Sequence, residues 1–518
     1  MIPHVVQFFP FLFWFCDGAK ILFVSPNLAN SMVLYTGRMA DVLVENGHEV
    51  TLLIPEIRAS NQLNGTKLAR VVRMKNLGDH FDKAMANYQD TFAPFRPSIW
   101  VRRAELIATA KICEALLRRF DELKWLRDEE FDLGIFDHVD FCDAGLIHAF
   151  GIRKYIWTTT GPILDINAWA MGIPAETSYV VTPWEGYHSP RMNIFERALN
   201  LFQVYFDRLL YLERTYAVTQ LFRRYIDSNF PNVVDIAKES SLLFVNADEF
   251  LEPARPTTSK VLYIGGVGLS NHSETIPTEL NEKINNISSD GFVYFSIGTS
   301  APTRFISLRL KKAIIDTFRL FPTYQFIVKV DSEDHDFFEL GSILTNVHVV
   351  SWAPQQSLLC HQKCSLFITH AGYNSLLESS RCGVPMLVFP IFFDQHRNAK
   401  VVEYREIGRI LKPEQITTDK LRKELEILLN DQSYAQKARR FAKLHHEKPN
   451  KPNQTLVNYV DFVLNNGPLR ELQSELTNLN WFQTSHLDIF FCLSVFAFVI
   501  VYFLRKLQKN VARKIKTN

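Results

Sequence analysis

The chain is short of cysteine, has almost no net charge and contains no low-complexity segment. Charged residues make up 22% and hydrophobic residues 47% of its 518 positions, which excludes a disordered chain, a collagen-like repeat and a multi-span membrane protein. Lysine and arginine number 57 against 55 aspartate and glutamate, a balance of +2 that favours no nucleic-acid partner. We therefore predict a globular protein that does not bind nucleic acid.

The seven cysteines offer little support for a scaffold or a metal site. Cys16 and Cys492 fall in apolar segments, and the chain has no CxxC pair. A disulfide framework and a zinc site are therefore poorly supported, and we predict buried free thiols and no metal. The chain also lacks a GxSxG elbow, which argues against a hydrolase. The five cysteines of the body are Cys113, Cys142, Cys360, Cys364 and Cys382.

An uncharged apolar run lies near the carboxyl terminus, at residues 489–504. As a helix it would span about 24 Å, close to the thickness of an endoplasmic reticulum bilayer, although buried core helices can have this length too. Residues 505–518 hold six basic and no acidic side chains, which leaves 51 basic and 55 acidic residues in the rest of the chain. By the positive-inside rule we predict a transmembrane helix at 489–504 and a basic cytosolic tail at 505–518.

At the amino terminus, residues 5–16 form an apolar stretch that resembles a secretory signal peptide, with a cleavage site after Gly18. The usual basic segment before it is missing, so an uncleaved anchor or a first core strand is the alternative. We predict a signal peptide at 1–18 and a body that faces the lumen. Four glycosylation sequons lie in that body, at Asn64, Asn271, Asn286 and Asn453.

Two series of alternating strands and helices predict an α/β fold. The alternation restarts after residues 252–256, which hold two prolines. Near-continuous apolar strands form parallel sheets covered on both faces, so we predict two facing, doubly wound, Rossmann-like domains, at 19–255 and 256–465, and a linker at 466–488. The expected strands are 21–24, 48–54, 131–136, 154–157, 242–245, 292–297, 325–330, 347–351, 366–369 and 386–389, and the expected helices include 37–46, 308–321, 433–446 and 455–465.

Residues 195–226 carry apolar and aromatic side chains at helical spacing, with charges between them. This pattern predicts a helix that packs in the core or lines a pocket, and contact with a membrane is the alternative.

The most informative segment leads from the strand at 366–369 into a helix, through His370, Gly372, Asn374 and Ser375. In open α/β sheets ligands bind at the carboxyl ends of strands, where the first N–H groups of a helix face an anion. Gly372 lets the backbone approach that anion, and the polar side chains around it can donate hydrogen bonds. We predict a diphosphate site here.

Further polar and aromatic residues suit the other parts of a sugar nucleotide. Glu378 lies one turn along the same helix face, where a carboxylate suits ribose hydroxyls. Trp352, with Gln355 close by, ends an earlier strand and offers a ring on which a base can stack. Asp394 and Gln395 end a later strand and suit sugar hydroxyls. Taken singly, each of these residues also has an ordinary structural explanation.

Together these residues resemble the signature of the UDP-glycosyltransferase family that includes the animal UDP-glucuronosyltransferases. The resemblance covers essentially the whole chain, from the signal peptide to the terminal span and short basic tail, and it implies a GT-B fold. The matching residues are Trp352, Gln355, His370, Gly372, Asn374, Ser375, Glu378, Gly383, Pro385, Pro390, Asp394 and Gln395.

The resemblance implies a UDP-sugar donor, no cofactor, and transfer of a hexosyl or glucuronosyl group to a small lipophilic acceptor with inversion. It assigns the uracil to Trp352 and Gln355, the diphosphate to His370, Gly372, Asn374 and Ser375, the ribose to Glu378, and the donor sugar to Asp394 and Gln395. Thr299 and Ser300 match the hydroxyl-bearing phosphate loop of the family.

On the acceptor side the chain departs from that family, whose members carry a general-base His after the first strand and a partner Asp at a later strand end. Aligning Ser31 and residues 37–41 with the family places Met32 at the base position, and a thioether cannot take a proton. Asp137 matches the partner Asp. Three interpretations stay open: acceptors that need little deprotonation, such as acidic phenols, carboxylates or amines; Asp137 or His138 as the base; or a binding protein without efficient turnover.

The last residues, 514–518, resemble a dilysine retrieval signal for the endoplasmic reticulum, and a plain basic tail is the alternative. We predict a single-pass protein of the endoplasmic reticulum membrane with a lumenal body. The sequence leaves the oligomeric state open, and a homo-oligomer is compatible with it.

Overall fold

The protein is described from a computed structural model, which covers residues 18–85, 99–137, 141–183, 186–269, 274–285, 290–299 and 301–516. Several sequence predictions lie outside these described residues. They are the signal peptide up to residue 17, the sequons at Asn271 and Asn286, and the site candidates His138 and Ser300.

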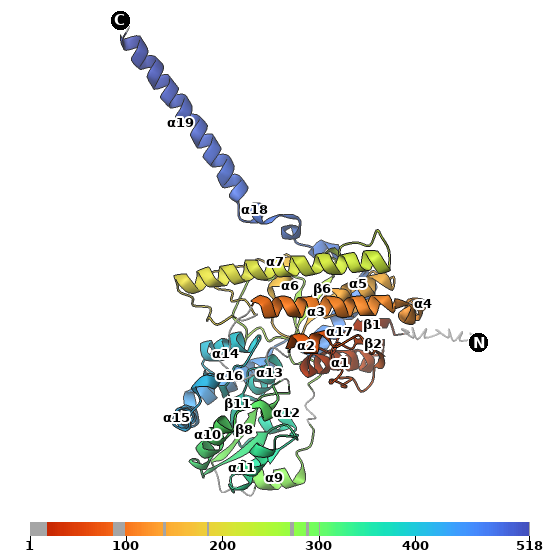
Figure 1. The fold of residues 1–518 in the computed structure, drawn as a ribbon, viewed down its shortest axis with the longest axis vertical. Helices are drawn as coiled ribbons and strands as arrows, with labels where there is room; N and C mark the ends of the chain where they lie inside the picture. Colours follow the sequence, from red (N-terminus) through yellow and green to blue (C-terminus); the bar gives the residue numbers. More distant parts are fainter. Residues whose placement is uncertain are drawn as a thin grey trace, which may run out of the picture.

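The first domain is built on a seven-stranded parallel sheet, in the order β3-β2-β1-β4-β5-β6-β7, with helices on both faces (Figure 1). Its central strands are buried apolar runs because both faces are covered. The strands are β1 (Lys20–Val24), β2 (Glu49–Pro55), β3 (Arg70–Met74), β4 (Leu133–Phe136), β5 (Tyr155–Thr159), β6 (Leu242–Val245) and β7 (Val261–Tyr263). The helices are α1 (Asn30–Glu45), α2 (His80–Met85), α3 (Ile99–Arg118), α4 (Trp125–Asp128), α5 (Cys142–Ala149), α6 (Asp165–Ala170), α7 (Ile194–Tyr225) and α8 (Val233–Lys238).

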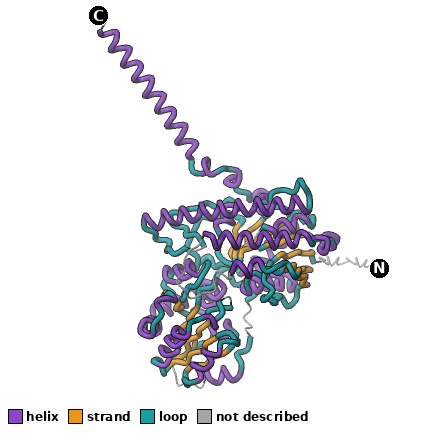
Figure 2. The backbone as a smooth tube through the Cα atoms, viewed as in Figure 1, coloured by secondary structure: helices purple, strands orange, loops and turns teal. Residues whose placement is uncertain are grey.

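The second domain contains a six-stranded parallel sheet, in the order β10-β9-β8-β11-β12-β13. Figure 2 shows the two groups of strands, each flanked by helices. Because β11 pairs with β8 and β12, the loop after β11 opens at the middle of the sheet edge. The strands are β8 (Gly291–Ser296), β9 (Tyr324–Lys329), β10 (Val347–Val350), β11 (Cys364–Thr369), β12 (Met386–Val388) and β13 (Gly408–Ile410). The helices are α9 (Thr278–Asn285), α10 (Leu308–Arg319), α11 (His335–Ser342), α12 (Gln355–Leu359), α13 (Tyr373–Cys382), α14 (Gln395–Tyr404), α15 (Thr418–Asn430) and α16 (Gln432–Glu447).

The predicted α/β fold with two doubly wound sheets is confirmed, and each strand expected from the sequence is present within a few residues. The sequence pattern does not predict β3, β7 and β13. All three lie at sheet edges, where a strand is short or partly exposed and needs no continuous apolar run. Helix α1 begins seven residues before the predicted start at Gly37. This glycine is a packing position, since a Cβ there would lie 2.0 Å from the carbonyl carbon of Gly65.

The chain crosses back to the first domain after α16. Helix α17 (Pro452–Asn466) buries Leu456, Val460 and Val463 in the hydrophobic cluster that also holds residues of β1 and α1. Side-chain bonds reinforce this contact, because the Lys154 ammonium donates to the Leu464 carbonyl oxygen at 2.7 Å. The last helix of the body is therefore part of the packing of the first sheet.

A single long helix ends the chain. Helix α19 (Leu487–Lys516) follows the short helix α18 (Trp481–Thr484) and extends away from the body in Figure 1. Its stretch Leu487–Asn510 has a mean hydropathy of 2.5 over its most apolar window and is long enough to cross a membrane. At about 1.5 Å per residue this stretch measures roughly 36 Å, so the helix is longer than the predicted span 489–504.

Two disulfides overturn the prediction of five buried free thiols. Cys113 of α3 is bonded to Cys142 of α5, and Cys360 is bonded to Cys382, while Cys364 is free. The odd number of cysteines gave no hint of this pairing, because the partners lie 29 and 22 residues apart and meet only where helices pack together. Closing loops of this length is worth about 3–4 kcal/mol each in the chain-entropy model.

Candidate functional site

A cavity of about 600 Å³ lies between the two domains, and residues of both line it. This volume is typical of a small-molecule site. The donor-side residues predicted from the sequence and described in the structure all line this one cavity, together with Met32 from the first domain. They are Thr299, Trp352, Gln355, His370, Gly372, Asn374, Ser375, Glu378, Asp394 and Gln395.

The loop between β11 and α13 forms the centre of the cavity wall. Ala371 has a φ of 64°, a left-handed conformation that is strained for a residue with a Cβ and that turns the chain sharply out of β11. Gly372 then caps α13, so the first N–H groups of the helix open toward the cavity. A helix start of this kind attracts an anion, which fits the predicted diphosphate position.

The His370 ring is held between two glycines. A Cβ on Gly372 would lie 2.5 Å from its Nε2 atom, and one on Gly298 would lie 2.6 Å from its Cε1 atom. Its Nδ1 has no hydrogen-bond partner among the described residues. Burial, with a smaller effect of the Lys329 charge, lowers the pKa of His370 to about 4, so the ring is neutral at pH 7. A buried neutral donor beside a helix start suits a phosphate oxygen.

Lys329 is a cavity residue that the sequence pattern did not identify. It ends β9, lines the cavity and donates to the carbonyl oxygen of Gly298 at 3.0 Å. Burial lowers its pKa, which Asp331 partly offsets. Its signal in the sequence is weak: a single charged residue near the end of an otherwise apolar strand. Its position next to His370 adds a positive charge to the end of the cavity where we predict the diphosphate.

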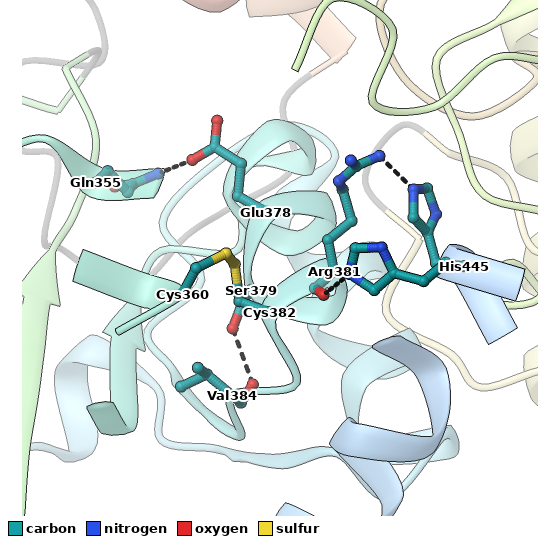
Figure 3. The surroundings of a disulfide bond; sticks show 9 residues. Gln355, Cys360, Glu378, Ser379, Arg381, Cys382, Val384 and His445 are labelled. Atoms are coloured by element: carbon teal, nitrogen blue, oxygen red, sulfur yellow. Dashed lines mark hydrogen bonds between the residues drawn. A yellow bond between two sulfur atoms is a disulfide. The ribbon is translucent and has the colours of Figure 1, made fainter. Parts of the chain in front are cut away.

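Gln355, Ser375 and Glu378 form a connected polar group at the start of α12 and on α13. The Gln355 amide donates to the Glu378 carboxylate at 2.7 Å and to the Ser375 hydroxyl at 3.2 Å. Burial raises the pKa of Glu378, while Arg38 and Gln355 act in the opposite direction. Figure 3 shows Gln355 and Glu378 near the Cys360–Cys382 disulfide. This disulfide ties the end of α12 to the end of α13.

Trp352 lies at the mouth of the cavity with 65% of its surface exposed. A ring exposed to this degree is free to stack on a planar base, which is the role that the resemblance implies.

Asn374 bridges the two domains. Its amide donates to the Ser31 carbonyl oxygen at 3.1 Å, and its Oδ1 accepts from the Asn246 amide at 2.8 Å. The structure therefore uses both ends of this side chain to hold the domains together. A direct diphosphate contact, as predicted from the sequence, would have to compete with these bonds.

Asp394 and Gln395 stand at the loop between β12 and α14. Gln395 is buried, and its Oε1 accepts from the backbone N–H groups of Ile391 and Phe392 at 2.9 and 3.1 Å, so it shapes the loop as well as lining the cavity. The fully buried Asn398 joins this loop to the β11–α13 loop, since its amide donates to Asp394 at 2.7 Å and to the Ala371 carbonyl at 3.0 Å.

On the acceptor side, the structure places Met32 in the cavity wall and Asp137 out of it. Met32 is 7% exposed, whereas Asp137 is fully buried and is not among the described residues that line the cavity. The Thr160 hydroxyl stands between Asp137 and the cavity and donates to the Asp137 carboxylate at 2.8 Å. Sequence reasoning missed Thr160, which follows β5 directly and carries no recognisable pattern.

The far wall of the cavity comes from α3 and α7. Arg102 forms an ion pair with Asp207, and burial lowers the pKa of Arg214 to about 9 in spite of the opposing charge of Glu105. Helix α7 therefore lines the pocket, as its sequence predicted. No three His, Cys, Asp or Glu side chains of the described residues are grouped so that they could hold a metal ion.

Comparison with known proteins agrees with this geometry. The sequence model described as "UDP-glucoronosyl and UDP-glucosyl transferase" matches residues 19–518. The Caenorhabditis elegans protein ugt-48, named as a UDP-glucuronosyltransferase, is 32% identical over 489 residues, with 91% of this chain and 90% of the relative covered. A human protein named 2-hydroxyacylsphingosine 1-beta-galactosyltransferase is 25% identical, with 98% and 92% covered.

The fold is shared with solved glycosyltransferase structures. The Phytolacca americana UGT2 structure matches with a TM-score of 0.57 and 16% sequence identity. The match covers 86% of this chain and all of that one. The two facing parallel sheets are thus a GT-B fold. By the match of nearly its whole length, this chain belongs to the UDP-glucoronosyl and UDP-glucosyl transferase family.

Proposed function

We propose that this protein is an inverting glycosyltransferase that moves a hexosyl or glucuronosyl group from a UDP-sugar to a small lipophilic acceptor. The observation that carries the proposal is the gathering of ten donor-side residues, from four separate connections between a strand and the next helix, around one cavity between the domains. Several of these polar groups are buried, and a buried polar group without a partner costs about 1–3 kcal/mol, so a polar ligand there accounts for their placement.

In the proposed reaction the acceptor atom bonds to the anomeric carbon on the face opposite UDP, as the bond from that carbon to the diphosphate oxygen breaks. The electron pair leaves on the diphosphate. The start of α13, the His370 ring and the Lys329 ammonium are the groups that would stabilise this charge.

Met32 limits how the acceptor loses its proton. Carboxylates, acidic phenols and amines need little help from a base, and we propose these as the preferred acceptors. For a neutral hydroxyl, the acceptor proton would pass to the Thr160 oxygen as the Thr160 proton moves to the Asp137 carboxylate. General-base help is worth about 10²–10⁴-fold in rate, so alcohols should be the poorer acceptors.

The donor site is tested by Glu378→Ala and His370→Ala, with Phe305→Ala on the exposed surface as the control. Turnover of UDP-sugars should be lost in the first two variants and kept in the control. The assay screens UDP-glucose, UDP-glucuronate, UDP-galactose and UDP-N-acetylglucosamine against pooled phenols, amines, acids and sterols. Unchanged turnover in both Glu378→Ala and His370→Ala would contradict the proposal.

The competing function is a binding protein for UDP-sugars or lipophiles, which the thioether at Met32 favours. Met32→His separates the two. A large gain on simple alcohols would point to an impaired base, and no change would point to another base or to acceptors that need none. UDP binding without turnover of any acceptor, in both the natural chain and Met32→His, would support the binding protein.

We further propose that the body lies in the lumen of the endoplasmic reticulum, anchored by α19. Two disulfides suit an oxidising compartment, and the sequon residues Asn64 and Asn453 are exposed. Glycosidase treatment should then lower the apparent mass of the membrane-bound protein. A tag on the tail should be cut by protease in sealed microsomes. A tag protected from the protease would show that the tail lies in the lumen, which contradicts the proposed orientation.

A further inference from the structure

The long helix α7 exposes a series of large apolar side chains on its outer face. Six of them follow one another at steps of three, four or seven residues, and these steps place them on one face of the helix. We call this row the α7 stripe. Phe195 is 83% exposed, Leu209 63% and Tyr216 68%. The α7 stripe consists of Phe195, Leu199, Phe202, Leu209, Leu212 and Tyr216.

The opposite face of α7 is buried and partly polar. Asn200 is fully buried and donates to the carbonyl oxygens of Thr177 and Val180 at 2.8 and 2.9 Å. Asp207 and Arg214 are buried on the same side, next to the cavity. A helix at a water-facing surface normally shows the reverse arrangement, with apolar residues inside and polar residues outside.

The α7 stripe is unusual on this molecule. Elsewhere on the described part of the body, exposed large apolar side chains occur in ones and twos along the sequence. Soluble monomers rarely expose a contiguous apolar row of this length, because its contact with water is unfavourable. The α7 stripe therefore needs a partner with an apolar surface.

The path of the chain toward α19 runs along the same side of the body. A Cβ on Gly172, just after α6, would meet the Ser474 side chain at 2.7 Å, and Gln473 accepts a hydrogen bond from Lys260. Helix α6 packs against α7. Figures 1 and 2 show α7 on the side of the body from which α18 and α19 depart. Residues 478–486 then connect to the anchor, and nine residues reach about 30 Å at most.

We propose that the α7 stripe lies in the surface of the bilayer that α19 spans. The short tether keeps α7 next to that bilayer, and the stripe offers what an interfacial helix needs: phenylalanine and leucine for the acyl boundary and a tyrosine at its end. The side of α7 that faces away from the bilayer lines the cavity through Tyr211 and Arg214. The membrane surface and the cavity are thus separated by one helix.

Two charged side chains of α7 lie near the α7 stripe, and each has a partner. Arg208 stacks over the Trp169 ring at 5.0 Å, and Glu213 pairs with Arg103 of α3 at 2.7 Å. The Glu213 side chain is 54% exposed on the same face of α7 as the stripe, where its pairing with Arg103 offsets its charge. The six residues of the α7 stripe themselves carry no charge. A second copy of the chain is the other conceivable apolar partner, and the experiment separates the two.

The test uses the full chain in phosphatidylcholine vesicles, with the photoreactive p-benzoylphenylalanine in place of Phe202. Phe305, which is 53% exposed on the second domain, receives the same replacement as a matched control. After irradiation, mass spectrometry detects phospholipid adducts and gel electrophoresis detects crosslinked dimers. Placing the probe at Phe195, the most exposed position of the stripe, gives a second variant that perturbs packing least.

Phospholipid adducts at Phe202 and Phe195, and none above background at Phe305, are expected. Crosslinked dimers without lipid adducts at the stripe would assign this face to a second copy and overturn the proposal. An equal lipid yield at Phe305, or no adduct at either stripe position in a folded chain with intact disulfides, would also overturn it. The inference rests on the anchoring by α19 proposed above, but its readout needs no glycosyl transfer, so its failure is distinguishable from a failure of the proposed reaction.

Discussion

His370 is the buried side chain whose protonation we expect to respond to an anion in the cavity. Its neutral state in the free protein follows from burial and from the nearby Lys329 ammonium, which both disfavour a second proton. An anion placed against the ring reverses this balance, because the imidazolium is then paired.

We expect a UDP-sugar to bind with uptake of a proton by His370. The pKa of about 4 in the free protein rises in the complex, so affinity should increase as the pH falls from 7 toward 5. Titration calorimetry with UDP-glucose, in two buffers of different ionisation heat at pH 5.5, measures the uptake. In His370→Gln the two buffers should give equal heats, and an unchanged proton uptake in that variant would assign it to another group.

Gly372 has a purely steric role that a one-atom change can test. In Gly372→Ala the new Cβ would lie 2.5 Å from His370 Nε2, so the ring must leave its position. UDP affinity should fall by roughly tenfold or more, in line with an overpacking cost of about 1–3 kcal/mol. Gly161→Ala is the matched control, since its Cβ would meet nothing closer than 3.8 Å in the same cavity. Equal affinities of the two variants for UDP would contradict the prediction.

At the scale of elements, the site depends on how two loops are joined. The β11–α13 and β12–α14 loops each contain a non-glycine residue with positive φ, Ala371 at 64° and Phe393 at 53°. Such conformations cost free energy and persist only where neighbours hold them. Asn398 is that neighbour for both loops, because its one amide group donates to both.

Asn398→Ala should lower the free energy of unfolding by about 1–3 kcal/mol, since it leaves buried acceptors without their donor. It should also weaken UDP-sugar binding, because both loops line the cavity. Glu403→Ala, on the exposed side of the same helix, should change stability by no more than about 0.5 kcal/mol. Chemical unfolding of the detergent-solubilised chain measures both, and similar values for the two variants would contradict the role of Asn398.

At the scale of the whole molecule, buried polar bonds join the two domains. Glu252, in the connection between them, accepts from Arg397 of α14 at 2.7 Å and from the Tyr373 hydroxyl at 2.9 Å. Asp248 bonds to His445 of α16 at 2.6 Å. Burial alone would raise the pKa of Asp248, but His445 and Lys448 lower it to about 2. The stability that the ionised Asp248 carboxylate contributes is therefore present above about pH 4 and is lost as the pH falls toward 2.

Arg397→Met should destabilise the chain by about 3–5 kcal/mol, because it leaves the Glu252 carboxylate buried without its ion pair. Adding Glu252→Gln should recover part of the loss. The exposed pair Arg422–Glu426 provides the control, where Arg422→Met should have an effect below about 1 kcal/mol. If Arg397→Met lowers the free energy of unfolding no more than Arg422→Met does, the Arg397–Glu252 pair does not hold the domains together.

Much of this architecture was open to prediction from local patterns. Buried parallel strands are continuous apolar runs, so the fold class could be predicted. The loops at the carboxyl ends of these strands carry residues such as His370 and Glu378, and their gathering around one cavity could be predicted as well. The edge strands β3, β7 and β13 could not be predicted in this way, because a strand at a sheet edge needs no continuous apolar run. Lys329 and Thr160 were missed because single polar residues at strand ends have no distinctive spacing.

The sequence by itself determined the order of most strands and helices, the family resemblance and the apolar terminal helix, because each depends on residues close together in the chain. It also led to the prediction that Met32 occupies the position of the usual base. Only the tertiary structure decided that four of five body cysteines pair, that Thr160 separates Asp137 from the cavity, and that α7 turns its apolar side outward. The physical reason is common to all three: each depends on segments distant in the chain that meet only through packing.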